Sequence, residues 1–271
     1  MITGLDEVYP REVAIDKIVD ADGNVSWIVA IPGTADTVSA NGEVVDVVSD
    51  LENVDGSTSD ATDLVLAAMA EAGIGEDEPV LLAGHSAGGM IASVLAASGS
   101  SPYSVTAVVT VGSPVSDVPH VPGVAYLHVE NEPDVVPALD GRRNPDGPDA
   151  VTAVFDSRAS ADPELAAASR TVIGAHQAST YAQGLALLDT NTSASMTVWR
   201  ERTAAFFAPA AAVERTVVSQ VHGPAPQPIP PCTPEPQQLP RPFEPAWEPP
   251  SRGEAIVQES ASPGGIPALR P

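Results

Sequence analysis

The stretch PVLLAGHSAGG, residues 79–89, decides the fold that this sequence predicts. It runs from apolar residues into a serine between glycines and then into small residues. A short, wholly apolar segment is typical of a strand covered on both faces, as in parallel sheets. The G-x-S-x-G pattern at residues 84–88 therefore predicts a sharp strand-to-helix turn with the Ser86 hydroxyl at its apex.

The residues around this turn alternate between strand-like and helix-like segments. Strands are expected at residues 11–19, 25–33, 79–84, 104–112, 124–130 and 150–156, and helices at 59–74, 87–98, 179–189 and 194–208. The first two strands flank DADGN, a strong hairpin signal. Ser59 is expected to cap the first helix and Gly73 to end it. The pattern predicts an α/β sheet, mainly parallel, with an antiparallel hairpin at its start.

The composition changes near residue 223 and indicates two parts. Residues 1–222 are expected to form one domain, whereas residues 223–271 hold more than half of the chain's 28 prolines and show no hydrophobic period. Such a segment buries too little apolar surface to offset its ordering entropy, so we expect a disordered Pro-rich tail. Its PxxP spacing suits a Pro-recognising partner, although a plain spacer is the favoured interpretation.

The charge and the hydropathy pattern exclude several classes of partner. A formal net charge of −24 repels nucleic acid and anionic lipid headgroups. No apolar run approaches the length of a membrane span, and the N-terminus lacks a signal-peptide pattern. As written, the chain is expected to be cytoplasmic, unless an export signal precedes it. Cys232 is the one cysteine, so no intramolecular disulfide is expected.

Placed at the apex of such a turn, Ser86 suits nucleophilic catalysis. The turn presents its hydroxyl at the positive end of the helix 87–98, where the Ala87 amide can donate to an oxyanion. Serine is a weak nucleophile at neutral pH, so it needs a general base, and the base needs an orienting acid.

Five motifs together resemble the α/β-hydrolases, and among them the fungal-type (class 3) lipases and their bacterial relatives. The motifs are IVAIPGT (28–34), LLAGHSAGG (81–89), VTVGSPV (109–115), NEPDVVPAL (131–139) and GAHQASTY (174–181), in the family's order. The resemblance implies a three-layer α/β-hydrolase sandwich. It also implies that the partners of the serine follow in the order acid, then histidine.

His176 is the favoured base among five histidines. It follows the last predicted core strand, and its AHQASTY context matches the family's histidine loop. His85 is expected to pack beside the nucleophile and His128 to be a satisfied core residue. The remaining candidates are His120, in a connecting loop, and His222, at the edge of the tail.

Asp134 is the favoured acid, because it follows the strand 124–130 and resembles the family's aspartate loop. Asp117 is its main rival, followed by Glu130 and Glu132. For the second oxyanion donor, the resemblance implies Thr34, in IPGT after an early strand.

The lengths of the connections predict an open site. Residues 113–123 are too few for an inserted cap domain, and residues 35–58 are acidic and poor in bulky apolar side chains. The resembling lipases carry an apolar lid in that region. This departure favours an esterase for soluble or moderately apolar acyl esters over a lipase acting at a lipid surface.

The sequence therefore predicts a serine esterase that forms an acyl-enzyme intermediate and takes a small acyl ester as substrate. No cofactor or metal is implied, and the acidic loop 144–150 is interpreted as a solvated turn, because it lacks a calcium-loop pattern. A thioesterase, an acyltransferase or a peptidase would use the same triad. Two hypotheses from different classes are a non-catalytic hydrolase-fold binding module and a structural protein with a Pro-rich arm.

Overall fold

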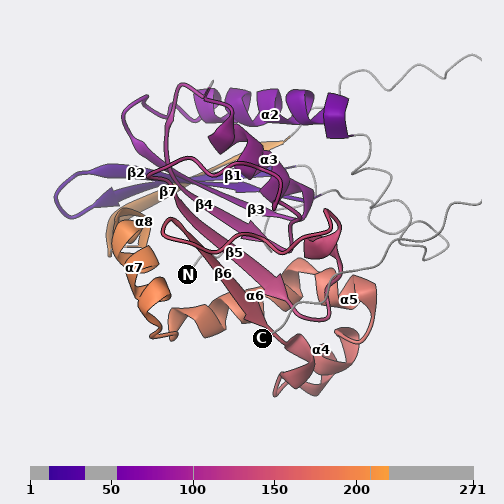
Figure 1. Ribbon diagram of the computed structural model, residues 1–271. Helices are drawn as coiled ribbons and strands as arrows, with labels where there is room; N and C mark the ends of the chain where they lie inside the picture. The colour runs from indigo at the N-terminus through magenta and orange to yellow at the C-terminus, as the bar shows by residue number, and fades with distance from the viewer. Residues whose placement is uncertain (1–11, 34–53, 100, 208, 220–271) are drawn as a thin grey trace, which may run out of the picture. The chain divides into compact units, whose positions relative to one another are not determined.

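A seven-stranded mixed sheet forms the centre of the computed structural model, which describes residues 12–33, 54–99, 101–207 and 209–219 (Figure 1). The strands are β1 (Glu12–Asp20), β2 (Val25–Ile31), β3 (Pro79–His85), β4 (Ser104–Val111), β5 (Ala125–Asn131), β6 (Ala150–Phe155) and β7 (Ala210–Ser219). Their order in the sheet is β6-β5-β4-β3-β2-β1-β7. Neighbours from β2 to β6 pair in parallel, whereas β1 pairs antiparallel with both β2 and β7. The predicted α/β class, with its initial hairpin, is confirmed.

Helices cover both faces of this sheet (Figure 1). They are α2 (Val54–Glu71), α3 (Ala87–Ala97), α4 (Pro163–Ala168), α5 (Val172–His176), α6 (Ala178–Asp189), α7 (Ala194–Arg202) and α8 (Ala204–Phe207). Two short 3-10 turns, η1 (Val136–Ala138) and η2 (Ser157–Ala159), follow β5 and β6. In Figure 1, α2 and α3 lie on one face of the sheet, and α6, α7 and α8 lie on the other.

Strands β1 to β6 each contribute to two apolar clusters, one on each face of the sheet. On β3, Val80 and Leu82 belong to the cluster that includes side chains of α2 and α3. Leu81 and Ala83 belong to the cluster that includes side chains of α6, α7 and α8. Because successive strand residues point to opposite faces, a strand covered on both sides must be apolar throughout. This explains the continuous apolar run that opens the decisive stretch.

The predicted boundaries of two helices need correction. The helix expected at residues 59–74 begins at Val54, so Ser59 lies inside it and does not cap it. The helix ends at Glu71, three residues earlier than expected, and Gly73 adopts φ +77° in the turn that follows. The helix expected at 194–208 is divided at Thr203, whose amide and hydroxyl both donate to the Trp199 carbonyl, at 3.0 and 2.8 Å. A hydroxyl that competes in this way for a backbone carbonyl favours a break.

Three elements were not predicted: β7, α4 and α5. β7 adds an edge strand that pairs with the whole length of β1, and Arg215 on β7 donates two hydrogen bonds to Asp16 on β1, at 2.7 and 2.9 Å. The predictions for residues 34–53 and for the tail at 223–271 lie outside the described residues. No helix in the described part of the chain is long and apolar enough to cross a membrane.

Candidate active site

Ser86 links β3 to α3 in a strained backbone conformation. Its φ is 55° and its ψ −125°, and among the described residues it is the one non-glycine with a positive φ. Its amide donates to the Val111 carbonyl of the neighbouring strand β4 at 2.9 Å, and its carbonyl accepts from the Gly89 amide at 3.0 Å. Positive φ disfavours a residue with a Cβ and is concentrated at functional sites. These backbone contacts hold the serine at the predicted apex.

The glycines around Ser86 allow close backbone approach. A Cβ on Gly84 would overlap the carbonyl group of Gly88, and a Cβ on Gly88 would overlap the carbonyl oxygen of Ile31 at the end of β2. Neither position can therefore carry a side chain without moving the backbone. Gly89 also allows a close approach, since a Cβ on this residue would overlap the Ser113 hydroxyl.

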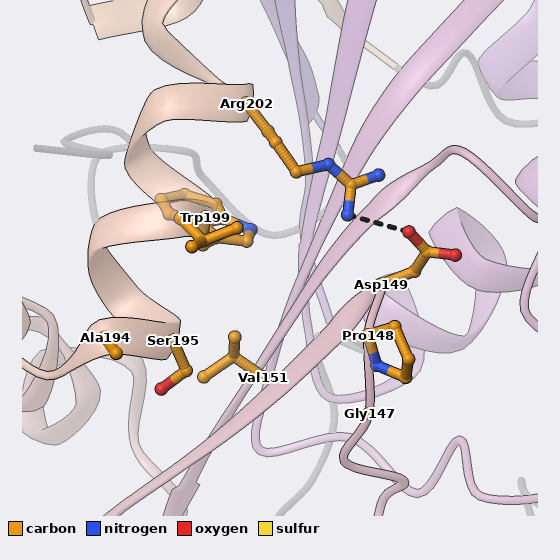
Figure 2. Close-up of a pocket in the computed structure, with 9 residues that line it drawn as sticks. Gly147, Pro148, Asp149, Val151, Ala194, Ser195, Trp199 and Arg202 are labelled. Carbon is orange, nitrogen blue, oxygen red and sulfur yellow. Dashed lines mark hydrogen bonds and ion pairs between the residues drawn. The ribbon is translucent and has the colours of Figure 1, made fainter.

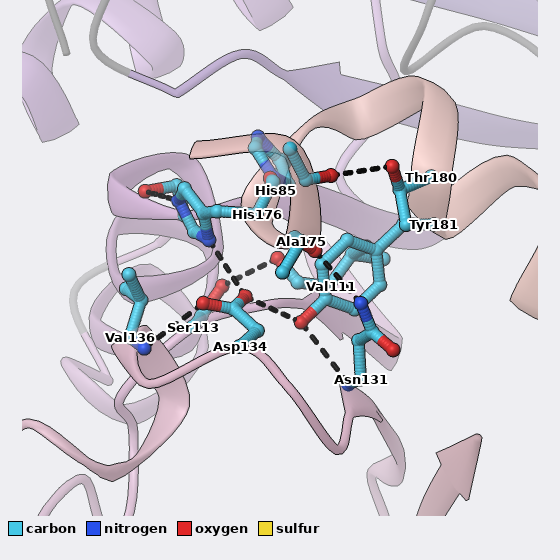
Figure 3. A network of polar contacts seen from close by, with 12 residues as sticks. His85, Val111, Ser113, Asn131, Asp134, Val136, Ala175, His176, Thr180 and Tyr181 are labelled. Atoms are coloured by element: carbon cyan, nitrogen blue, oxygen red, sulfur yellow. Dashed lines mark hydrogen bonds and ion pairs between the residues drawn. The ribbon is translucent and has the colours of Figure 1, made fainter. Parts of the chain in front are cut away.

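The three residues predicted to meet lie within hydrogen-bond distance of one another. His176 Nε2 is 2.9 Å from Ser86 Oγ, and His176 Nδ1 is 2.7 Å from Asp134 Oδ2 (Figure 3). The pairs are separated along the chain by 90 and 42 residues. All three residues are buried, and the Asp134 side chain has no exposed surface. Nδ1–H donates to the carboxylate, which leaves Nε2 free to accept the serine proton.

The strand order explains how these residues meet. β3, β4 and β5 are parallel neighbours, so their carboxyl ends lie at one edge of the sheet. Ser86 follows β3, Asp134 follows β5, and His176 ends the one-turn helix α5, which comes after β6. The edge formed by the carboxyl ends of parallel strands is where α/β proteins place their ligands.

Sequence reasoning missed two residues that help to hold Asp134: Tyr181, which contacts it directly, and Asn131, which contacts Tyr181. The Tyr181 hydroxyl donates to Asp134 Oδ2 at 2.6 Å and accepts from the Asn131 amide at 3.1 Å (Figure 3). The Val136 amide donates to Asp134 Oδ1 at 3.0 Å. Burial, together with the neighbouring Asp134, raises the pKa of Tyr181, so this hydroxyl keeps its proton. Asn131 and Tyr181 stand in the NEPD and STY stretches, but nothing in their spacing shows the contact.

The alternative acids, Asp117, Glu130 and Glu132, each interact with a residue outside the triad. Asp117 forms an exposed ion pair with Arg142 at 3.1 Å, and Glu132 forms one with Arg158 at 3.1 Å. Glu130 accepts from the Asn144 amide at 3.4 Å. His176 Nδ1 is therefore hydrogen-bonded to Asp134, and these three carboxylates are engaged elsewhere.

The rival histidines are also accounted for. His128 is fully buried, with its Nδ1 2.7 Å from Thr110 Oγ1 and its Nε2 3.1 Å from His120 Nε2. It is thus the satisfied core histidine that the sequence predicts. His85 does more than pack, since its Nε2 donates to the His176 carbonyl oxygen at 2.8 Å. His222 lies outside the described residues.

The buried His128 makes stability depend on pH. Burial, assisted by the neighbouring His120, lowers the pKa of His128 from 6.5 to about 3. An unfolded histidine therefore binds a proton below about pH 6.5 that the folded one refuses. The free energy of unfolding should be highest above that pH and fall towards pH 5, by up to about 1.4 kcal/mol per pH unit for this group. Urea unfolding at pH 7, 6 and 5 measures this slope.

The matched variant for this prediction is His128→Gln. Its stability at pH 7 is expected to be lower, because a packed buried residue is replaced, but its slope between pH 7 and 5 should be smaller. The variant keeps every other titratable group, so the difference between the two slopes reports on His128. A slope that is equal in the two proteins would contradict the prediction.

The structure describes only one of the two predicted oxyanion donors, Ala87. Ala87 is the first residue of α3, where helix amides lack intrahelical partners. Thr34 lies outside the described residues. The preceding Gly33 lies directly beside Ser86, since a Cβ on Gly33 would be 3.1 Å from Ser86 Cβ.

A separate cavity of about 240 Å³ lies between α7 and the start of β6 (Figure 2). Trp199, Val151 and Pro148 line it, and Arg202 forms an ion pair with Asp149 beside it at 2.8 Å. This is the amino-terminal end of β6, whereas the triad lies where the parallel strands end. The cavity therefore does not belong to the triad.

The described residues hold no group of three or more His, Cys, Asp or Glu side chains that could bind a metal ion. In the loop 144–150, Asn144 is buried rather than solvated, because it donates to the Ser113 carbonyl at 3.0 Å and accepts from the Val115 amide at 3.1 Å. This residue therefore connects the loop to the segment that follows β4.

The scan against protein-family models and the search of curated proteins found no match for this chain. The assignment of a function therefore depends on the geometry described above.

Proposed function

We propose that this protein is a serine hydrolase that cleaves carboxylic esters through an acyl-enzyme intermediate, with Ser86 as nucleophile, His176 as base and Asp134 as orienting acid. One observation carries the proposal: His176 Nε2 lies 2.9 Å from Ser86 Oγ while Nδ1 lies 2.7 Å from Asp134. A nucleophile–base–acid chain of this kind is recognised by geometry and not by sequence position.

The proposed reaction has two halves. Ser86 Oγ attacks the ester carbonyl carbon as His176 Nε2 takes the hydroxyl proton, and Asp134 stabilises the resulting imidazolium. The Ala87 amide donates to the oxyanion, with Thr34 as the second donor that the resemblance implies. The alcohol leaves with the proton from His176. Water then attacks the acyl-enzyme, His176 takes the proton of the water, and the acid leaves as Ser86 regains its proton.

We also propose that the fold is that of the α/β-hydrolases, with the fungal-type lipases and their bacterial relatives as the nearest resemblance. The mainly parallel sheet, the strained Ser86 after an apolar strand and the order serine, aspartate, histidine all support it.

Exposed apolar side chains next to the triad favour acyl esters over polar substrates. Val135 and Leu139 follow Asp134, and Val172 and Ile173 lie four and three residues before His176; all four are exposed. Apolar groups in water gain free energy when an apolar chain covers them. A substrate with an aliphatic acyl chain would bury them.

This arrangement predicts which substrates a single substitution affects. In Ile173→Ser, the ratio of kcat/KM for the octanoyl ester to that for the acetyl ester of nitrophenol should fall about fivefold to thirtyfold, because covering an isoleucine contributes about 1–2 kcal/mol. Leu187→Ser, near the end of α6, removes an apolar side chain that is more exposed than Ile173, at 62% against 36%, and should leave the ratio unchanged. Equal effects of both variants would contradict the substrate assignment.

The experiment that tests the proposed function is labelling with a fluorophosphonate, which reacts with activated serines. The folded wild type should take up one label, located on the peptide that contains Ser86 by mass spectrometry, and Ser86→Ala should take up none. Absence of label on folded wild type would overturn the proposal. Hydrolysis of oxygen esters, thioesters and amides in parallel then separates an esterase from a thioesterase or a peptidase.

A further inference from the structure

The helix that carries His176 is only one turn long. α5 spans five residues, Val172–His176, and Thr171 caps its start by accepting a hydrogen bond from the Gly174 amide at 3.0 Å. The last carbonyl groups of any helix lack intrahelical partners. In a helix this short, the backbone at the base is therefore fixed by contacts from outside the helix.

Three successive carbonyl groups at this end each accept a hydrogen bond from a side chain of a different element. Thr180 Oγ1 on α6 donates to Gly174 O at 2.6 Å. Asn131 Nδ2 on β5 donates to Ala175 O at 2.8 Å. His85 Nε2 on β3 donates to His176 O at 2.8 Å. Figure 3 shows these side chains around the base. We call His85, Asn131 and Thr180 the carbonyl clamp.

The clamp is built into the core. Thr180 has no exposed surface and Asn131 is 1% exposed. Asn131 Oδ1 accepts from the Ser157 amide at 3.0 Å, and this second bond fixes the amide orientation, so that Nδ2 faces Ala175. Both ends of the Asn131 side chain are thus engaged.

His85 has one ring proton available for the clamp. Burial and the neighbouring His176 lower the pKa of His85 from 6.5 to about 4, so the ring is neutral at pH 7. A neutral imidazole has a single N–H. Because a carbonyl oxygen can only accept, that proton lies on Nε2. His85 also lies beside the base itself, with the two ring centroids 4.8 Å apart.

We propose that the carbonyl clamp positions the catalytic base: His85, Asn131 and Thr180 act through the backbone of residues 174–176 to hold the His176 imidazole between Ser86 and Asp134. This inference rests on the proposed function. His85 is its most informative member, because it adjoins Ser86 in the chain and so ties the backbone of the base to the strand that carries the nucleophile.

The clamp matters because a base must be held within a fraction of an ångström of its productive position. A displacement of about 1 Å costs on the order of a hundredfold in rate. A displaced His176 also loses contact with Asp134, so the imidazolium that forms during the reaction is less well stabilised.

The decisive variants are His85→Leu, which removes the donor, and His85→Gln, which can still donate to the carbonyl. With a short soluble nitrophenyl ester, His85→Leu should lower kcat about tenfold to a hundredfold with little change in KM. The acid limb of its pH–rate profile should move to lower pH. His85→Gln should recover most of the loss. The rate of fluorophosphonate labelling should follow kcat in all three proteins.

His128→Leu is the matched control, because it also removes a hydrogen-bonded histidine from the sheet but not from the clamp. It should lower Tm and leave kcat and the pH profile near those of wild type. If His85→Leu does not fold, Thr180→Val decides the matter, since it keeps the side-chain shape and removes only the donor to Gly174; a severalfold lower kcat is expected.

The outcomes separate this inference from the proposed function. Wild type that takes no label overturns the proposed function and the clamp with it. If wild type takes up the label but His85→Leu has the same kcat and the same acid limb as wild type, the clamp alone is overturned. A His85→Gln variant as slow as His85→Leu would also overturn it.

Discussion

Replacing His176 by alanine is expected to lower kcat for ester hydrolysis by about 10⁴-fold to 10⁶-fold, the range found when one member of a serine triad is removed. Without an imidazole 2.9 Å from Ser86 Oγ, the hydroxyl has no acceptor for its proton and stays a weak nucleophile. The measurement is kcat with a nitrophenyl ester at pH 7 to 8, alongside the rate of fluorophosphonate labelling.

The control for this prediction is His120→Ala. His120 stacks on Tyr126, with ring centroids 3.9 Å apart, and contacts His128 rather than the triad. It should retain most of the activity. If His176→Ala kept a tenth or more of the wild-type kcat while folded, another group would have to be the base.

The second large effect is expected on stability, from Gly88→Ala. A Cβ at this position would overlap the carbonyl oxygens of Ile31 and Pro32, and backbone atoms cannot move aside as a flexible side chain can. Forced overpacking costs about 1–3 kcal/mol or more. The free energy of unfolding, measured with urea, should fall by at least that amount, and ester hydrolysis should fall with it because α3 must shift away from β2.

Gly147→Ala provides the comparison. A Cβ on Gly147 would have no atom within 4 Å, and its φ is not positive. It should therefore change stability by no more than about 0.5 kcal/mol. Equal stability of Gly88→Ala and wild type would mean that β2 and α3 do not approach as closely as described.

Local sequence signals predicted much of the fold. The apolar run before Ser86 predicted β3, because a strand covered by helices on both faces must be apolar throughout. The DADGN turn predicted the hairpin of β1 and β2, since its residues favour turns wherever they occur. In both cases the reason for the structure lies within a few residues.

What the sequence did not predict depends on contacts between distant segments. β7 was missed, because its partner β1 lies about two hundred residues earlier, with Arg215 and Asp16 separated by 199 positions. Pairing of this kind leaves only a weak local pattern. The early start of α2 at Val54 was missed because Ser59 is a good cap residue, whereas the structure places it inside the helix.

The candidate site shows the same division. Ser86 could be predicted from its own turn, and His176 and Asp134 from a resemblance of short motifs in order. Tyr181 and Asn131, which contact Asp134 and the loop of the base, could not, since their bonds span 47 and 44 residues. Hydrogen bonds between residues so far apart in the sequence follow no fixed spacing that could be recognised in the chain.

The positive φ of Ser86 has a consequence for any attempt to make this protein more heat-resistant. A residue with a Cβ in such a conformation costs about 1–3 kcal/mol, and glycine would not carry that cost. Ser86→Gly should therefore melt at a higher temperature than the parent while hydrolysing nothing. A selection for thermal stability alone would favour the loss of Ser86, so any library screened for thermal tolerance should be screened for turnover in the same round.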